Sequence, residues 1–185
     1  MISDRQRWNR KYRQMDTAGE SVAPIVAAHY PLAPPGRALD IAAGAGQNAR
    51  FLAEKGFTVT AVDISDVALA PLAGIHPRLH PVCLDLDQWT PPKNRFQLVI
   101  DLRYLNRRLF TPIHESLAKG GVLIFETFID PPPGRDVASH CKDYLLKENE
   151  LRHTFSSMDI VLYEEAVREC PQGIGKMASL VAVKR

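Results

Sequence analysis

The chain has 185 residues, of which 45% are hydrophobic and 24% charged, and its formal net charge is +2. This length is typical of one domain, and the composition excludes a disordered tail, a collagen-like chain and a coiled coil. The small charge excess gives no support for a nucleic-acid partner or for a basic membrane-binding surface. We therefore expect a single folded domain over residues 1–185.

No segment of the sequence predicts a membrane span or a secretory leader. The longest uncharged stretch, 21–36, is shorter than a membrane span and contains four prolines. The first fifteen residues are charged and have no apolar core of the kind that signal peptides carry. Cys83, Cys141 and Cys170 form no Cys-x-x-Cys pair, as expected of reduced thiols. We expect a cytoplasmic protein with no membrane partner.

A basic helix is expected first in the chain. Residues 4–15 place Trp8, Tyr12 and Met15 on one helix face, at positions i, i+4 and i+7. A weak second helix is expected at 22–29, so residues 1–30 would form an N-terminal helical cap on a core of residues 36–185. Four helices are expected within the core, at 47–55, 65–72, 106–118 and 147–155.

Apolar runs alternate with these helices, which favours a parallel sheet because each right-handed crossover needs a helix. Five runs follow this rhythm, at 37–42, 57–62, 79–84, 96–100 and 121–128. The last two runs, 158–164 and 176–183, are joined without a helix, so they are expected to form an antiparallel hairpin. The sequence predicts an α/β fold with a Rossmann-like, doubly wound, seven-stranded sheet that is mostly parallel and ends in an antiparallel hairpin.

A glycine loop follows the first expected strand. Gly44 and Gly46 stand between strand and helix, where missing side chains let a ligand approach backbone N–H groups at the helix start. Asp63 ends the next strand, 17 residues after Gly46, where a carboxylate can accept hydrogen bonds from both hydroxyls of a ribose. Loop and acid together predict an adenosine-containing cofactor.

Two such cofactors compete for this loop, a nicotinamide dinucleotide and S-adenosylmethionine. Gly44, Gly46 and Ala49 satisfy the relaxed G-x-G-x-x-A pattern of dinucleotide sites. Asp40 precedes the first glycine by four residues, and its carboxylate would repel a pyrophosphate but attract an ammonium or a sulfonium. The chain is also short for two mononucleotide halves and a substrate domain. S-adenosylmethionine is favoured, with a nicotinamide-dependent oxidoreductase as an alternative.

From about Trp8 to Val183 the chain resembles the class I S-adenosylmethionine-dependent methyltransferases. The resemblance rests on Leu39–Gly46, on Asp63 and Asp85, on Phe96–Asp101, on Leu117–Gly121 and on the closing hairpin. The N-terminal Trp8–Arg13 segment and the small size are similar to the tellurite-resistance and thiol methyltransferase branch. Ala42 departs from the family pattern, because it stands where the first glycine of the loop is expected.

The resemblance implies a cofactor-binding role for eleven residues. Asp40 would hold the loop and the ammonium region of the cofactor, and Asp63 would hold its ribose hydroxyls. Asp85 and Asp101 have an alternative interpretation, because an acid at a strand end is also common in turns and helix caps. Trp8 and Tyr12 could likewise pack against each other without covering a cofactor, because side chains at i and i+4 of a helix are neighbours. Gly44 and Gly46 would lie beneath the methionine and ribose parts, and Asp101 and Leu102 would border the methionine end. Ile64, Asp85 and Leu86 would contact the adenine. Trp8 and Tyr12 would cover the cofactor as a lid.

Methyl transfer from a sulfonium requires alignment and exclusion of water, and only some acceptors need a base. Tyr104, Arg107 and Glu126 follow or end the fourth and fifth strands, and they are the candidate catalytic or acceptor-binding residues. Arg107 could clamp an anionic acceptor, although surface charge at a helix start explains it as well. Glu126 stands in an apolar strand, where burial of an unpaired carboxylate is costly. Its side chain should therefore either have a hydrogen-bonding or charged partner or face the cleft.

The acceptor is expected to be a small molecule. The chain lacks the Asn/Asp-Pro-Pro-Tyr and Pro-Cys motifs of nucleic-acid methyltransferases after its fourth strand. A loop at 129–143 is expected to cover the acceptor side. His140 and Cys141 are adjacent in it, but no second pair stands at ligand spacing, so no metal site is expected. A non-catalytic S-adenosylmethionine-binding or interaction protein is the alternative from another functional class.

Overall fold

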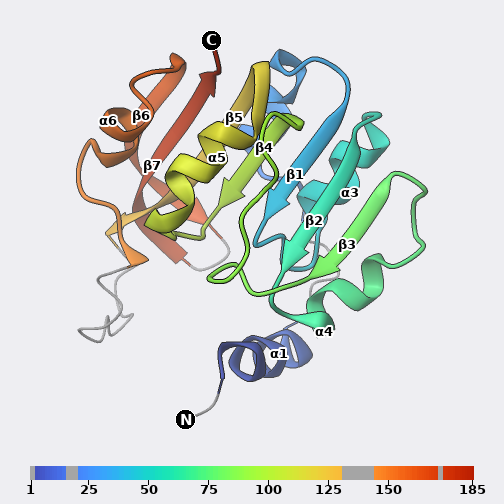
Figure 1. The fold of residues 1–185 in the computed structure, drawn as a ribbon. Coiled ribbons are helices and arrows are strands. Elements are labelled where there is room, and N and C mark those ends of the chain that lie inside the picture. Colours follow the sequence, from blue (N-terminus) through green and yellow to red (C-terminus); the bar gives the residue numbers. More distant parts are fainter. Residues whose placement is uncertain (1–2, 16–20, 131–143, 171–172) are drawn as a thin grey trace.

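The computed structural model describes residues 3–15, 21–130, 144–170 and 173–185 (Figure 1). The loop expected at 129–143, with His140 and Cys141, lies outside this part of the chain except for its first two residues. Within the described ranges, no helix is long and apolar enough to cross a membrane.

A single seven-stranded sheet has the order β3-β2-β1-β4-β5-β7-β6. The pairs β2–β3, β1–β2, β1–β4 and β4–β5 are parallel, whereas β7 runs antiparallel to both β5 and β6. The predicted fold class, including the closing hairpin, is confirmed. The strands are β1 (Arg37–Ile41), β2 (Thr58–Asp63), β3 (Leu79–Cys83), β4 (Phe96–Leu102), β5 (Leu117–Asp130), β6 (Asp159–Cys170) and β7 (Gly173–Val183).

The helices are short, and several continue into or from 3-10 turns. They are α1 (Asp4–Gln14), α2 (Pro24–His29), α3 (Gln47–Glu54), α4 (Asp66–Leu69), α5 (Phe110–Ser116) and α6 (Glu150–Thr154), with 3-10 turns η1 (Tyr30–Leu32), η2 (Ala70–Leu72) and η3 (Arg107–Leu109). The helix expected at 106–118 ends at Ser116, because Leu117 is already extended and pairs with Phe96 of β4. Strands β6 and β7 run further than expected, because they continue to pair with each other as far as Cys170 and Gly173.

Two apolar cores lie on the two faces of the sheet. One packs Phe125 of β5 with Ile113 of α5 and Leu151 of α6. The other packs Val59 of β2 with Leu52 of α3. Helices therefore cover both faces, so the central strands are buried on both sides and their sequences read as nearly continuous apolar runs.

Helix α1 lies beside the carboxyl ends of the parallel strands (Figure 1), and polar contacts hold it there. The side chain of Asn9 donates to Asp66 Oδ1 over 2.8 Å and accepts from Ser65 Oγ over 2.7 Å. Arg5 Nε donates to the carbonyl of Ile64 over 3.1 Å. No residue of α1 is buried. The helix is thus attached to the start of α4 by hydrogen bonds, not by a share of either apolar core.

The loop from β1 to α3 uses left-handed backbone three times, at Ala42 (φ 53°), Gly44 (φ 56°) and Gly46 (φ 76°). Alanine is strained in this conformation, which gives a physical reason for the glycine that the family pattern has at position 42. A Cβ on Gly46 would lie 2.3 Å from Cδ1 of Leu72, a fully buried side chain. A Cβ on Gly46 would therefore point into the core, which leaves the backbone of Gly46 as the part that is predicted to lie beneath a ligand.

This packing predicts that Gly46→Ala is costly. We expect a loss of about 2 to 4 kcal/mol in the free energy of unfolding, from backbone strain and from overpacking against Leu72. Gly74 is a matched control, because its φ is 75° but a Cβ there would meet nothing within 4 Å. Gly74→Ala should cost only about 1 kcal/mol. Urea unfolding of both variants measures the difference, and equal losses would contradict the packing argument.

Candidate functional site

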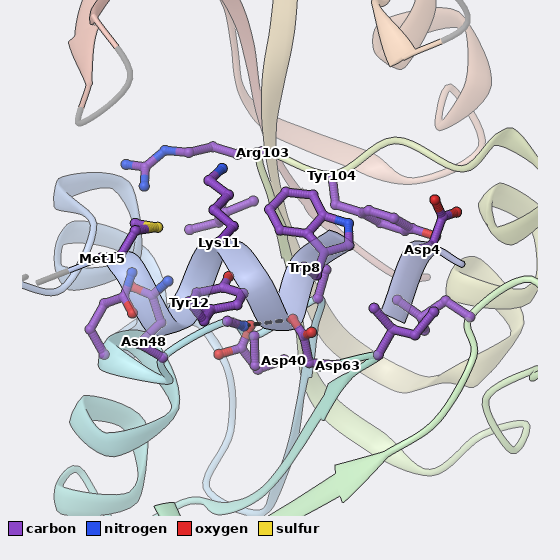
Figure 2. Close-up of a pocket in the computed structure, with 18 of the residues that line it drawn as sticks. Asp4, Trp8, Lys11, Tyr12, Met15, Asp40, Asn48, Asp63, Arg103 and Tyr104 are labelled. Atoms are coloured by element: carbon purple, nitrogen blue, oxygen red, sulfur yellow. Dashed lines mark hydrogen bonds between the residues drawn. The ribbon is translucent and has the colours of Figure 1, made fainter. Parts of the chain in front are cut away.

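A pocket opens between α1 and the carboxyl ends of the parallel strands (Figure 2). This is the crevice in which open α/β sheets bind ligands. The pocket brings together ten of the site residues that the sequence predicts: Trp8, Tyr12, Asp40, Gly44, Asp63, Ile64, Asp85, Leu86, Leu102 and Tyr104. Four others do not line it: Gly46, Asp101, Arg107 and Glu126.

Asp63 joins the glycine loop to the turn that follows β2. Its Oδ2 accepts a hydrogen bond from the backbone N–H of Gly44 over 2.8 Å, and its Oδ1 accepts one from Ser65 N–H over 2.8 Å. A carboxylate can accept up to about four hydrogen bonds, so these backbone donors do not use all of its acceptor capacity. Only 6% of Asp63 is exposed, and burial raises the pKa of its carboxyl against the opposing effect of these backbone donors.

Three buried carboxylates gather at the ends of neighbouring strands, on Asp40, Asp63 and Asp101. Burial, and then the charge of Asp63, raises the pKa of Asp40 to about 8. Burial and the charge of Asp40 raise the pKa of Asp101 well above its usual range. Oδ2 of Asp40 and Oδ1 of Asp101 are buried without a hydrogen-bond partner in the described ranges.

No positive side chain neutralises these acids within the part of the chain that the structure describes. None of the ion pairs found there includes Asp40, Asp63 or Asp101. The same residues contain no group of three or more His, Cys, Asp or Glu side chains arranged to hold a metal ion. The floor of the pocket therefore suits an organic cation that brings its own hydrogen-bond donors.

The segment after β3 forms another wall of the pocket, through Asp85, Leu86 and Asp87. Oδ1 of Asp85 accepts from the N–H of Asp87 over 2.9 Å, so Asp85 also acts as a turn former. Arg108 fixes this segment, because it donates to the carbonyls of Leu86 and Trp89. Leu86 and Ile64 are apolar residues that line the same pocket.

The side chains of Trp8 and Tyr12 project from α1 into the pocket (Figure 2). Their ring centroids are 6.0 Å apart. A Cβ on Gly44 would lie 2.5 Å from the hydroxyl oxygen of Tyr12, so a glycine is required at this close approach. Both aromatic side chains predicted as a lid thus lie at the pocket, and Lys11 and Met15 of the same helix line it with them.

Tyr104 lines the pocket beyond the end of β4. Its hydroxyl accepts a hydrogen bond from Asn106 Nδ2 over 3.3 Å. Burial is the main cause that raises the pKa of Tyr104 to about 12. The phenol is therefore protonated at neutral pH, where it can donate a hydrogen bond but is a poor base.

Arg107 and Glu126, two of the candidate catalytic or acceptor-binding residues, do not line the pocket. Arg107 forms a two-pronged ion pair with Glu150, with Nε–Oε1 at 2.6 Å and Nη2–Oε2 at 2.9 Å. Glu126 Oε2 accepts from Ser179 Oγ over 2.6 Å and lies 3.8 Å from Nε of Arg168. These partners come from α6, β6 and β7, so Arg107 and Glu126 connect segments that are far apart in the sequence.

The sequence places the basic stretch 103–108 beside the cleft but assigns no role to Arg103, which lines the pocket directly after β4. It also assigns no role to Lys11, on the face of α1 that carries Trp8 and Tyr12. The position of Arg103 in the sequence could have indicated a place at the pocket, since it follows Asp101 and Leu102 at the carboxyl end of a central strand.

A family model described as a methyltransferase domain matches residues 10–163. The fold is similar to that of TehB from Haemophilus influenzae, with a TM-score of 0.77 and 19% identity over 98% of this chain and 67% of that chain. It is also similar to an S-adenosylmethionine-dependent methyltransferase from Mesorhizobium loti, with a TM-score of 0.69 and 20% identity over 90% of this chain and 99% of that chain.

A third similar structure is 1,6-didemethyltoxoflavin-N1-methyltransferase from Burkholderia thailandensis, which holds 1,6-didemethyltoxoflavin and S-adenosylhomocysteine. Its TM-score is 0.71, and it is 25% identical over 95% of this chain and 83% of that chain. No curated protein sequence gives a significant match.

The raised pKa of Asp40 predicts a pH-dependent stability. The folded protein holds the Asp40 proton up to about pH 8, whereas the unfolded chain releases it near 3.8. Between these values the folded state binds more protons, so rising pH destabilises it. Asp40→Asn removes this penalty, and we expect the variant to gain about 3 to 4 kcal/mol relative to wild type between pH 5 and pH 8. Urea unfolding at several pH values measures this, and a constant difference would contradict it.

Proposed function

This chain belongs to the family of methyltransferase domains, and we propose that it transfers the methyl group of S-adenosylmethionine to a small-molecule acceptor by in-line displacement. The observation that carries the proposal is the pair of buried acids that line the pocket, Asp40 and Asp63, together with Oδ2 of Asp40, which has no hydrogen-bond partner in the described ranges. Binding of an ammonium or a sulfonium would favour the ionised form of these acids, whose pKa values burial raises, and would offset the negative charge that they then carry. A pyrophosphate would add to it, so the same observation opposes a nicotinamide dinucleotide.

Particular residues would hold the methyl donor. Asp40 would face its ammonium, with Asp101 behind it adding to the negative potential. The free lone pairs of Asp63 would accept from the ribose hydroxyls. The remaining surfaces would enclose the rest of the donor, with Ile64, Asp85 and Leu86 at the adenine, Leu102 and the backbone of Gly44 at the methionine part, and Trp8 and Tyr12 above.

When bound, S-adenosylmethionine supplies an electrophilic methyl group on a positively charged sulfur. The chain's own residues position the reactants and keep water away from them, which is the main requirement of this displacement. Trp8 and Tyr12 exclude water on the side of α1. Tyr104 stays protonated and can orient the acceptor as a hydrogen-bond donor. The acceptor should therefore supply its own lone pair, without proton removal by Tyr104.

A small-molecule acceptor is supported by one of the similar structures. The Burkholderia thailandensis methyltransferase is named for 1,6-didemethyltoxoflavin and was solved with it bound.

We expect Asp63→Asn to weaken the binding of S-adenosylhomocysteine by about tenfold or more, because an amide accepts fewer hydrogen bonds than a carboxylate. Isothermal titration calorimetry measures the affinity. Glu54→Gln is the control, since Glu54 is an exposed acid on α3 that does not line the pocket. Thermal unfolding of Asp63→Asn checks that the glycine loop still folds. Unchanged affinity in a folded variant would contradict the ribose assignment.

We expect turnover with S-adenosylmethionine carrying a labelled methyl group and a panel of thiols, phenols, amines and small acids. Labelled product and S-adenosylhomocysteine should form together. Binding of S-adenosylhomocysteine with no labelled product across the panel would favour a non-catalytic binding protein. Binding of a nicotinamide cofactor but not of S-adenosylhomocysteine would overturn the proposed function.

A further inference from the structure

Arg103 lines the pocket but has no role in the proposed function. It follows β4 directly and lines the pocket together with Lys11 of α1. Figure 2 shows Arg103 and Lys11 on one side of the pocket and Asp40 and Asp63 on the other. Two basic side chains thus line the pocket opposite Asp40 and Asp63, with Asp4 of α1 as a further acid, and a ligand that carries both charges would match Arg103 and Lys11 on one side and Asp40 and Asp63 on the other.

The backbone around Arg103 is held in a strained conformation. Its φ is 61°, in the left-handed region that favours glycine, and its N–H donates to the carbonyl of Glu126 over 2.7 Å. A glycine would make the same turn at a lower conformational cost. Strain of this kind is common at ligand-binding positions. The geometry of the turn therefore does not explain why position 103 carries a long cationic side chain.

The guanidinium of Arg103 has no anionic partner among the residues that the structure describes. Its Nε is buried and makes no hydrogen bond there. None of the ion pairs includes Arg103, although Asp101 is only two residues away. In contrast, Arg107 is paired with Glu150, and Arg168 is paired with Glu164 and lies near Glu126.

A guanidinium keeps its charge at all physiological pH values and carries five N–H donors in a planar fork. This geometry matches the two oxygens of a carboxylate or of a phosphate group. Partial burial strengthens such a pair, because less water competes for the donors. The chemistry that would satisfy Arg103 is therefore an oxyanion inside the pocket.

We propose that Arg103 binds an oxyanion group of a ligand in this pocket. Two ligands can supply that group under the proposed function. One is the methyl donor, through the carboxylate of its methionine part. The other is the acceptor, if it carries a carboxylate, a phosphate or a similar group. The choice between them rests on the proposed function, whereas oxyanion binding by Arg103 does not.

Three variants test the proposal. Arg103→Gln removes the charge, and Arg103→Lys keeps a charge but loses the planar fork. Arg50→Gln is the matched control, because Arg50 is exposed on α3 and does not line the pocket. Three probes are titrated calorimetrically: S-adenosylhomocysteine, 5′-methylthioadenosine, which lacks the amino-acid part, and inorganic phosphate added to the protein with and without S-adenosylhomocysteine.

Two results would support the proposal. If the oxyanion belongs to the donor, Arg103→Gln should weaken S-adenosylhomocysteine by about tenfold or more and leave 5′-methylthioadenosine unchanged. If it belongs to the acceptor, S-adenosylhomocysteine should bind as in wild type, while phosphate binding to its complex is lost. In either case Arg103→Lys should recover part of the affinity, and Arg50→Gln should match wild type.

Two results would overturn the proposal. One is that Arg103→Gln binds every probe as wild type does. The other is an equal loss for all probes together with a lowered melting temperature, which would make Arg103 a structural residue. A wild-type protein that binds phosphate through Arg103 but does not bind S-adenosylhomocysteine would refute the proposed function and leave the oxyanion site standing.

Discussion

The burial of Asp40, Asp63 and Asp101, with the charge of Asp63 acting on Asp40 and that of Asp40 acting on Asp101, is the constraint on which the rest of the site depends. The three acids lie at the ends of β1, β2 and β4, and these strands are neighbours because the sheet order reverses at β1. Burial raises the pKa values of all three, so keeping them ionised together costs free energy. Such an arrangement weakens the folded protein at neutral pH, and binding of a cation offsets that cost. Stability and ligand binding are therefore coupled through the same carboxylates.

The loop above these acids is shaped by different demands on each of its glycines. Gly44 has no side chain because the hydroxyl of Tyr12 lies against it, whereas Gly46 has none because Leu72 packs there. Asp63 holds the loop in place by accepting the N–H of Gly44. One carboxylate thus serves both the backbone geometry and, in our proposal, the ligand. A substitution at Asp63 must be interpreted with both effects in view.

Polar contacts, not apolar packing, attach α1 to the body of the protein. Asn9 and Arg5 contact the turn that begins α4, and Trp8 and Tyr12 point into the pocket. Hydrogen bonds of this kind contribute little net stability at an exposed site. The helix can therefore contribute side chains to the pocket without carrying much of the fold's stability, which suits a segment that covers a ligand.

The sequence by itself determined the order of helices and strands, the closing hairpin and the glycine loop with Asp40 and Asp63. These features depend on the period of apolar residues and on neighbours close in the chain. Only the tertiary structure decided that Gly46 faces the core, that Arg103 faces the pocket and that Arg107 does not. Their roles depend on Leu72, on a left-handed turn beside β5 and on Glu150 of α6, all of which act across elements. The direction of a side chain beyond a strand end is set by such contacts, because no local pattern restricts it.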